Sequence, residues 1–206
     1  VPLDQGLSGL TGLSRVDLAA ARAAVEGVEL VAVVTPREQE QLLLGMRGVA
    51  SARAFASGLH VSAALDADAA IAALASAVGV EDAPGLGAGG GAALAIVALG
   101  GRVLSGVDLC AQVAGLPRTL RVADVALTAT DSIDFVSRGG DVVAAVSELA
   151  AEAMVPCVVV AREVHVSARE LRTFGVESAH AVGGDADLAS GELTRRCASV
   201  AASWTW

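Results

Sequence analysis

Residues 84–101, PGLGAGGGAALAIVALGG, place a run of glycines directly before an apolar stretch with helical spacing. Glycine lacks a Cβ, so the backbone N–H groups of such a turn can approach an anion closely, and the helix dipole adds positive potential. This spacing indicates phosphate binding, with Gly85, Gly87, Gly89, Gly90 and Gly91 as the predicted cofactor-binding positions. All fourteen basic residues are arginines, so backbone amides and arginines would have to hold the phosphate without lysine.

The same glycine run has other interpretations. Gly85, Gly87 and Gly90 match a G-x-G-x-x-G pattern, but a dinucleotide fingerprint follows a strand, whereas a predicted helix and an acidic break precede this one. A Walker A loop needs Gly-Lys-Ser/Thr, which the segment lacks. A flexible connector that allows tight helix packing remains the alternative that involves no ligand.

A second candidate site is the polar segment of residues 128–134, TATDSID, expected just past the carboxyl end of a predicted parallel strand. Open α/β sheets place their ligands at that end. Asp131 and Asp134 are suited to hold Mg²⁺ or to act on a substrate hydroxyl, and Thr128 and Thr130 are predicted to contact the cofactor. A polar loop whose acids cap a helix explains the same pattern without a ligand.

Two further features favour structural roles. Gly139 and Gly140 again precede a predicted helix, but the carboxylate of Asp141 would interact with the helix dipole itself and repel a phosphate. None of the three histidines has a serine, aspartate or cysteine partner at catalytic spacing.

The elements that must position these residues follow from hydrophobic periodicity and from capping signals. The alternation of elements after Gly87 predicts βαβ units and a parallel sheet, hence an α/β fold. Predicted helices cover residues 14–26, 38–44, 50–56, 63–78, 91–99, 105–114, 140–154 and 187–204, with a further one opened by Ser167 and Glu170; predicted strands cover 28–34, 122–128, 155–161 and 179–182.

Composition narrows the class of protein. The net charge of −9 argues against nucleic-acid binding, because nucleic acids select basic surfaces. Cys110, Cys157 and Cys197 are far apart in apolar patterns, which predicts buried free thiols and a reducing, cytoplasmic setting. No signal peptide or membrane span is expected, and the first residue is valine, which indicates a processed, trimmed or partial chain.

The order of these segments resembles the glycerate kinase family of bacterial, two-lobed ATP-dependent kinases. The family's PGAGAAGGLGA motif is similar to residues 84–93, and its LGAxLxSGIDxV motif is similar to residues 99–109. The family's DLVITGEGRID motif falls on residues 124–134, and the resemblance continues in register through residues 155–160 to the end. It implies a glycerate-kinase-like fold, ATP and Mg²⁺ as cofactors of an active member, and a glycerate-like hydroxy acid as substrate.

The departures from the family pattern concern charged groups. The family's DVDNPL motif falls on residues 35–40, TPREQE, which keep neither aspartate. Of the family's GEGRxD residues only Asp134 remains, and the family's Gly-Lys falls on Gly140 and Asp141. The family's N-terminal segment, with its Ser-Phe-Lys-Gly motif, has no counterpart. Phosphoryl transfer depends on positioning and on charge stabilisation, so these losses argue against catalysis.

We therefore expect a partial α/β lobe over residues 1–80 and a nucleotide-type α/β lobe over residues 84–206. The expected function is that of a pseudokinase that retains the fold, with a nucleotide, a small acid or only a protein as its ligand. The alternatives are an active kinase for glycerate or a related hydroxy acid, using Asp131 and Asp134 with Mg²⁺, and a structural or partner-binding module. An open sheet edge would favour a second chain, an N-terminal partner segment or a homo-oligomer.

Overall fold

A computed structural model describes residues 10, 13–183 and 190–204. The chain divides into two compact units, Val1–Leu109 and Cys110–Trp206. The boundary that the sequence places near residues 81–84 therefore lies inside the first unit. The reason is a non-local strand pair, since β1 (Val31–Val34) lies parallel to β2 (Arg102–Ser105) and ties the glycine run to the first unit.

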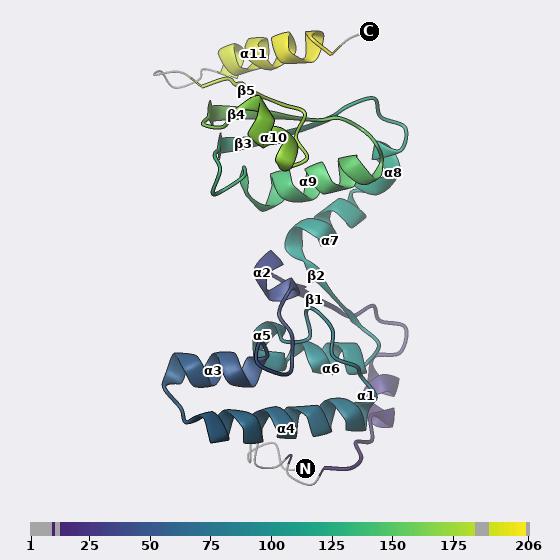
Figure 1. The fold of residues 1–206 in the computed structure, drawn as a ribbon. Helices are drawn as coiled ribbons and strands as arrows, with labels where there is room; N and C mark the ends of the chain where they lie inside the picture. Colours follow the sequence, from purple (N-terminus) through teal and green to yellow (C-terminus); the bar gives the residue numbers. More distant parts are fainter. Residues whose placement is uncertain (1–9, 11–12, 184–189, 205–206) are drawn as a thin grey trace. The chain divides into compact units, whose positions relative to one another are not determined.

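The first unit combines this two-stranded sheet with short helices and one helical hairpin (Figure 1). The hairpin consists of α3 (Val49–Ser57) and α4 (Val61–Val78). At the start of α4 the His60 side chain accepts a hydrogen bond from the Ser62 N–H, and at its end Gly79 adopts the left-handed conformation. The remaining helices are α1 (Ala19–Ala24), α2 (Pro36–Gln39), α5 (Ala88–Gly91) and α6 (Ala93–Ala98), and α7 (Gly106–Val113) spans the boundary between the units.

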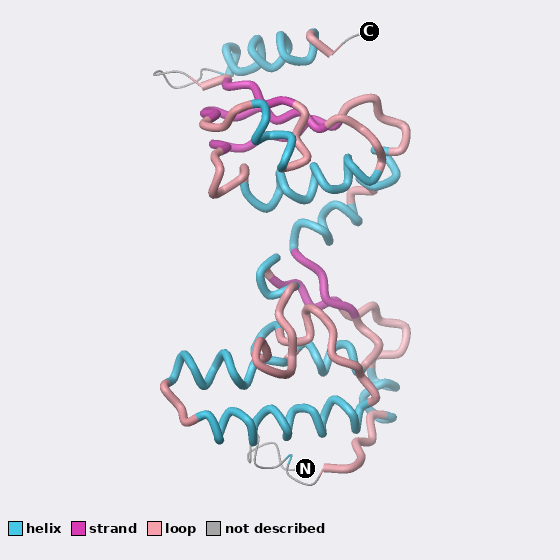
Figure 2. Tube along the Cα trace, viewed as in Figure 1, coloured by secondary structure: helices cyan, strands magenta, loops and turns pink. Residues whose placement is uncertain are grey.

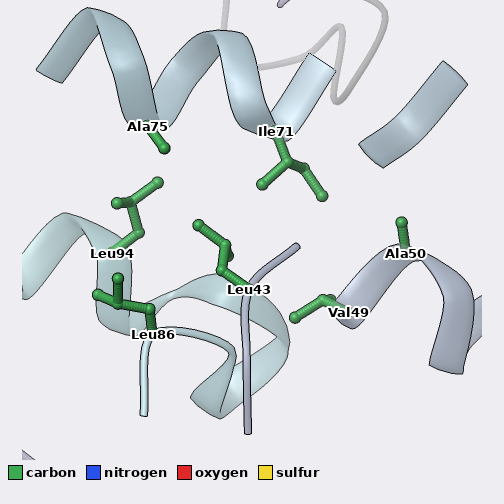
Figure 3. Packing of buried hydrophobic residues seen from close by; sticks show 7 residues of the cluster. All are labelled: Leu43, Val49, Ala50, Ile71, Ala75, Leu86 and Leu94. Atoms are coloured by element: carbon green, nitrogen blue, oxygen red, sulfur yellow. The ribbon is translucent and has the colours of Figure 1, made fainter. Parts of the chain in front are cut away.

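Leucines from loops and helices fill the core of the first unit. Leu43 is 1% exposed, and Ile71 and Ala75 of α4 converge on it (Figure 3). By length and composition α4 is the one described helix that could cross a membrane, but it contains Asp66 and Asp68, and the Asp68 carboxylate accepts a hydrogen bond from the Gly45 N–H at 2.9 Å. One face of α4, with Ile71 and Ala75, packs on the core of this unit, and most of the helix is exposed.

The second unit is a layered α/β structure with a parallel sheet in the order β3-β4-β5. Figure 2 shows the three strands as neighbours. Their bounds are Ala126–Ile133, Cys157–Val164 and Ser178–Ala181, and the helices are α8 (Leu116–Leu120), α9 (Gly140–Glu152), α10 (Ala168–Thr173) and α11 (Ser190–Ala202).

The two faces of this sheet have separate cores. Val159 and Ala161 of β4 pack with α9 and α10, whereas Val158 and Val160 pack with α11 (Figure 1). β4 is buried on both faces, which explains its continuous apolar run. The α/β fold with parallel strands that the sequence predicts is confirmed.

Three local predictions need correction. β2 was not predicted, because a four-residue strand has no readable period and its partner lies far away in sequence. β3 continues to Ile133 instead of ending near Thr128, because its pairing with β4 persists as far as Val164. Of the cysteines only Cys157 is fully buried; Cys110 is exposed and Cys197 is half-buried, since both lie on amphipathic helices.

Candidate functional site

The glycine run packs its own backbone against the segment before it. The N–H groups of Gly85 and Gly87 both donate to the Gln41 carbonyl oxygen at 3.0 Å, and the Gly91 N–H donates to the Gly87 carbonyl. A Cβ on Gly87 would lie 2.2 Å from the Leu42 carbonyl oxygen, so this position requires glycine. These amides thus have partners within the protein.

The remaining glycines form a left-handed turn that contacts an acidic side chain. Gly89, Gly90 and Gly91 have φ values of 59°, 70° and 93°. The Gly89 N–H donates to Glu38 Oε1 at 3.3 Å, while Glu38 Oε2 accepts from the backbone and hydroxyl of Thr35. Hydrogen bonds from the Thr35 and Gly89 backbone lower the pKa of Glu38. A carboxylate of the chain itself therefore already lies against Gly89, and the phosphate-binding role of the glycines stays a prediction.

Thr128 and Thr130 lie inside β3 and face α9. The Thr128 side chain is buried, and the Thr130 hydroxyl donates to the Gly139 carbonyl oxygen at 3.0 Å. This bond connects β3 to the start of α9, where Gly139 has a φ of 85° and a Cβ would lie 2.9 Å from Val143 Cγ2. Both threonines thus contribute to the packing of strand on helix.

Asp131 lies on the opposite face of β3, the face covered in part by α11. Its carboxylate forms a bidentate ion pair across to β4, with Arg162 Nε at 2.7 Å from Oδ1 and Nη2 at 3.2 Å from Oδ2. Hydrogen bonds from the Arg162 guanidinium lower the pKa of Asp131. Arg162 also pairs with Glu163, which in turn contacts His165 Nε2 at 3.0 Å.

Asp134 caps the turn that follows β3. Oδ1 accepts from the Val136 N–H at 2.7 Å and from the Ser137 N–H at 2.8 Å, and Oδ2 accepts from the Ser137 hydroxyl at 2.9 Å. Hydrogen bonds from the Ser137 backbone and hydroxyl, followed by that from Val136, lower the pKa of Asp134. Both oxygens of this carboxylate are therefore used locally.

The two predicted catalytic acids have different surroundings. Asp131 lies within β3 and Asp134 lies in the turn after it, and each has its own set of partners. Among the described residues, no group of three or more histidine, cysteine, aspartate or glutamate side chains could hold a metal ion. A Mg²⁺ ion would have to share or replace these hydrogen bonds, and the metal-binding role of both acids stays a prediction.

Sequence reasoning missed Arg162 and a depression next to it. We call this depression the β3 groove; it has a volume of about 390 Å³ and is lined chiefly by Leu127, Ala129, Val160, Leu193 and Cys197. The Asp131–Arg162 pair lies at its polar end. The register Ala129↔Val160 places Arg162 directly opposite Asp131, a neighbourhood that becomes visible only once the strand pairing is known.

The amino-acid sequence of this chain matches a known protein family. The sequence model of the glycerate kinase family matches residues 1–198. Uncharacterized proteins of Mycobacterium bovis (strain ATCC BAA-935 / AF2122/97) and Mycobacterium tuberculosis (strain CDC 1551 / Oshkosh) are each 30% identical over 168 residues, which are 79% of this chain and 43% of the relative.

A solved structure agrees at the level of the fold. The crystal structure of "putative glycerate kinase 2 from Salmonella typhimurium LT2" matches with a TM-score of 0.59 and 20% identity, over 96% of this chain and 53% of that chain. The chain thus spans about half the length of the relatives that it matches.

Proposed function

The chain belongs to the glycerate kinase family, and we propose that it retains the family's α/β fold without phosphotransferase activity of its own. The observation that carries the proposal is the internal use of its acids. Asp131 is paired with Arg162, and Asp134 accepts three hydrogen bonds from its own turn.

The pKa directions support this proposal. A general base works best when its pKa lies near the operating pH, which requires a carboxylate pKa to be raised. The hydrogen bonds around Asp131 and Asp134 lower both pKa values instead. The arrangement therefore stabilises fixed carboxylate charges and does not prepare either group to accept a proton.

Ligand binding is a separate part of the proposal. A family member without turnover can still bind ATP or a glycerate-like acid, and a cytoplasmic location would supply both. If Mg²⁺ takes part, Asp131 and Asp134 would hold it, at the expense of the partners described above. Such an ion would supply charge neutralisation for a bound triphosphate.

The experiment combines a binding readout with a turnover readout. The melting temperature is followed while ATP is added with and without Mg²⁺ and glycerate, and the same mixtures are assayed for ADP and phosphoglycerate. A ligand at about 100 times its Kd adds about 2.7 kcal/mol of stability, which a melting curve resolves easily. Asp134→Asn is compared with Asp124→Asn, which changes an exposed aspartate outside these contacts.

The outcomes separate the candidate functions. Stabilisation by ATP without product formation supports a pseudokinase that binds nucleotide. Formation of phosphoglycerate that Asp134→Asn abolishes and Asp124→Asn preserves would overturn the proposal in favour of an active kinase. If neither stabilisation nor product is seen, the chain is a structural or partner-binding module.

A further inference from the structure

A small cleft lies between α9 and α10, on the sheet face opposite α11. It has a volume of about 220 Å³, less than the roughly 300–1,000 Å³ of pockets that hold drug-sized ligands, so it fits a small molecule. Asp131 and Asp134 do not line it, and the cleft is therefore separate from the candidate site described above. Its polar and aromatic lining residues are Arg138, Ser147, Glu148, Thr173 and Phe174.

Arg138 is fixed at this cleft by its backbone and by an aromatic ring. Its φ is 50°, in the left-handed region that a residue with a Cβ adopts only at an energetic cost, and its N–H donates to the Asp134 carbonyl oxygen at 2.9 Å. The guanidinium carbon lies 5.1 Å from the centre of the Phe174 ring, which is a cation–π contact. Because this contact uses the face of the guanidinium, the N–H groups at its edge can still donate to a bidentate partner.

Glu148 brings the opposite charge to the same cleft. It occupies an exposed position of α9. In the part of the chain that the structure describes, Arg138 pairs with no carboxylate and Glu148 pairs with no cation, although both line one small volume. The cleft thus presents two opposite charges that do not neutralise each other.

Two hydroxyl groups in the cleft act as hydrogen-bond acceptors for a ligand. The Ser147 hydroxyl donates to the Ala144 carbonyl oxygen at 2.9 Å, and the Thr173 hydroxyl donates to the Glu170 carbonyl oxygen at 2.7 Å. Since each hydroxyl has only one proton to donate, its oxygen remains as an acceptor. Such oxygens, together with a carboxylate, suit an ammonium group, which has three donors and no acceptor.

We propose that this cleft binds a zwitterionic amino acid. Arg138 holds its carboxylate through two N–H···O hydrogen bonds, and Glu148 and the two hydroxyls hold its ammonium group. Ala151, Gly175 and the Phe174 ring leave room for a short aliphatic chain. A simple anion would meet the charge of Glu148 and leave it unpaired, so the cleft selects ligands with both charges. Binding here does not depend on whether the chain transfers phosphoryl groups.

Isothermal titration calorimetry of the 206-residue chain measures the binding. The probes are L-alanine, β-alanine and 4-aminobutyrate, which carry the two charges at increasing separation. Propionate and propylamine each keep one of these charges, and glycerate represents the hydroxy acid of the proposed function.

Each charged residue of the cleft has a matched control on the same unit. Arg138→Asn is compared with Arg169→Asn, and Glu148→Gln is compared with Glu152→Gln. Arg169 of α10 and Glu152 of α9 are exposed and do not line the cleft. Asparagine tolerates the left-handed conformation at position 138, so this variant should fold, and circular dichroism checks that it does.

We expect one of the zwitterions to form a one-to-one complex and to bind at least about tenfold more tightly than propionate, propylamine or glycerate, since each of these lacks one charge-assisted contact. Arg138→Asn and Glu148→Gln should each weaken binding by about tenfold or more, and both control variants should bind like the original chain. The proposal is overturned if no zwitterion binds, if propionate or glycerate binds as tightly as the best zwitterion, or if either cleft variant binds normally. ATP titration of the same samples reports on the proposed function independently.

Discussion

Replacing Gly87 by alanine tests whether the glycine run serves packing or ligand approach. The φ of Gly87 is −77°, which any residue adopts, so alanine would introduce only a steric conflict. The new Cβ would lie 2.2 Å from the Leu42 carbonyl oxygen and 2.6 Å from Gln41 Cγ. Overpacking of this kind costs about 1–3 kcal/mol. Disturbing the two hydrogen bonds to the Gln41 carbonyl adds about 1 kcal/mol each, for about 3–5 kcal/mol in total.

The two units have different spectroscopic probes for this measurement. Both tryptophans, Trp204 and Trp206, are in the second unit, so tryptophan fluorescence follows that unit while far-UV circular dichroism follows both. With a urea m-value of about 2 kcal/mol per M, the expected loss moves the unfolding midpoint of the first unit by about 2 M. The fluorescence transition should remain in place.

Gly90→Ala is the matched control in the same segment. Gly90 has a φ of 70°, but a Cβ there would meet nothing within 4 Å. The expected cost is the left-handed backbone strain alone, about 1–2 kcal/mol. If Gly87→Ala destabilises the first unit no more than Gly90→Ala, the packing argument is refuted. A selective loss of ATP-induced stabilisation in Gly87→Ala would instead support the phosphate-binding prediction.

Three further predictions concern the second unit. Asp134→Ala should destabilise the second unit at pH 7, and the difference from the original chain should shrink as the pH falls below about 4. Because the pKa of Asp134 is lowered in the folded state, its stabilisation is fully present above the ordinary carboxyl pKa and is lost as the pH falls through the folded value. Urea unfolding at pH 7 and pH 3 checks this. Val159→Ala, at a fully buried position, should cost about 2–3 kcal/mol by the same assay, from the lost apolar burial and the cavity left behind. Burial raises the pKa of Cys157 to about 11, so alkylation at pH 8 followed by mass spectrometry should modify the exposed Cys110 first and Cys157 only after unfolding.

Local signals in the sequence are sufficient to predict several strands and helices of the second unit. The buried run before Ala161 predicts β4 because a strand covered on both faces is continuously apolar. The Ser167–Glu170 capping box predicts the start of α10, and both of its hydrogen bonds are present. Each of these signals lies within a few residues of the feature it specifies.

The elements that sequence reasoning missed depend on distant partners. β2 becomes a strand by pairing with β1, about seventy residues earlier in the chain. Thr128 to Ser132 looks like a polar loop because its polar side chains find partners that only the fold supplies, as the Thr130 hydroxyl does at Gly139 and the Asp131 carboxylate does at Arg162. The Asp131–Arg162 pair likewise requires the register of β3 on β4.

Three acids, the two predicted site residues Asp131 and Asp134 and the neighbour of the glycine turn, Glu38, each have a local partner. Glu38 accepts from Gly89, Asp131 pairs with Arg162, and Asp134 caps its own turn. Each contact is exposed, so the stabilisation it provides is modest and screened by salt. A bound phosphate or Mg²⁺ could therefore displace such contacts only by offering stronger ones to the same groups. At Gly89 a phosphate oxygen would replace the Glu38 carboxylate oxygen at little net gain, whereas at Asp131 a cation would have to replace a bidentate arginine. Of these three places, the glycine turn is therefore the one where a ligand would displace the weakest contact, and Asp131 and Asp134 are the ones where it would displace the strongest.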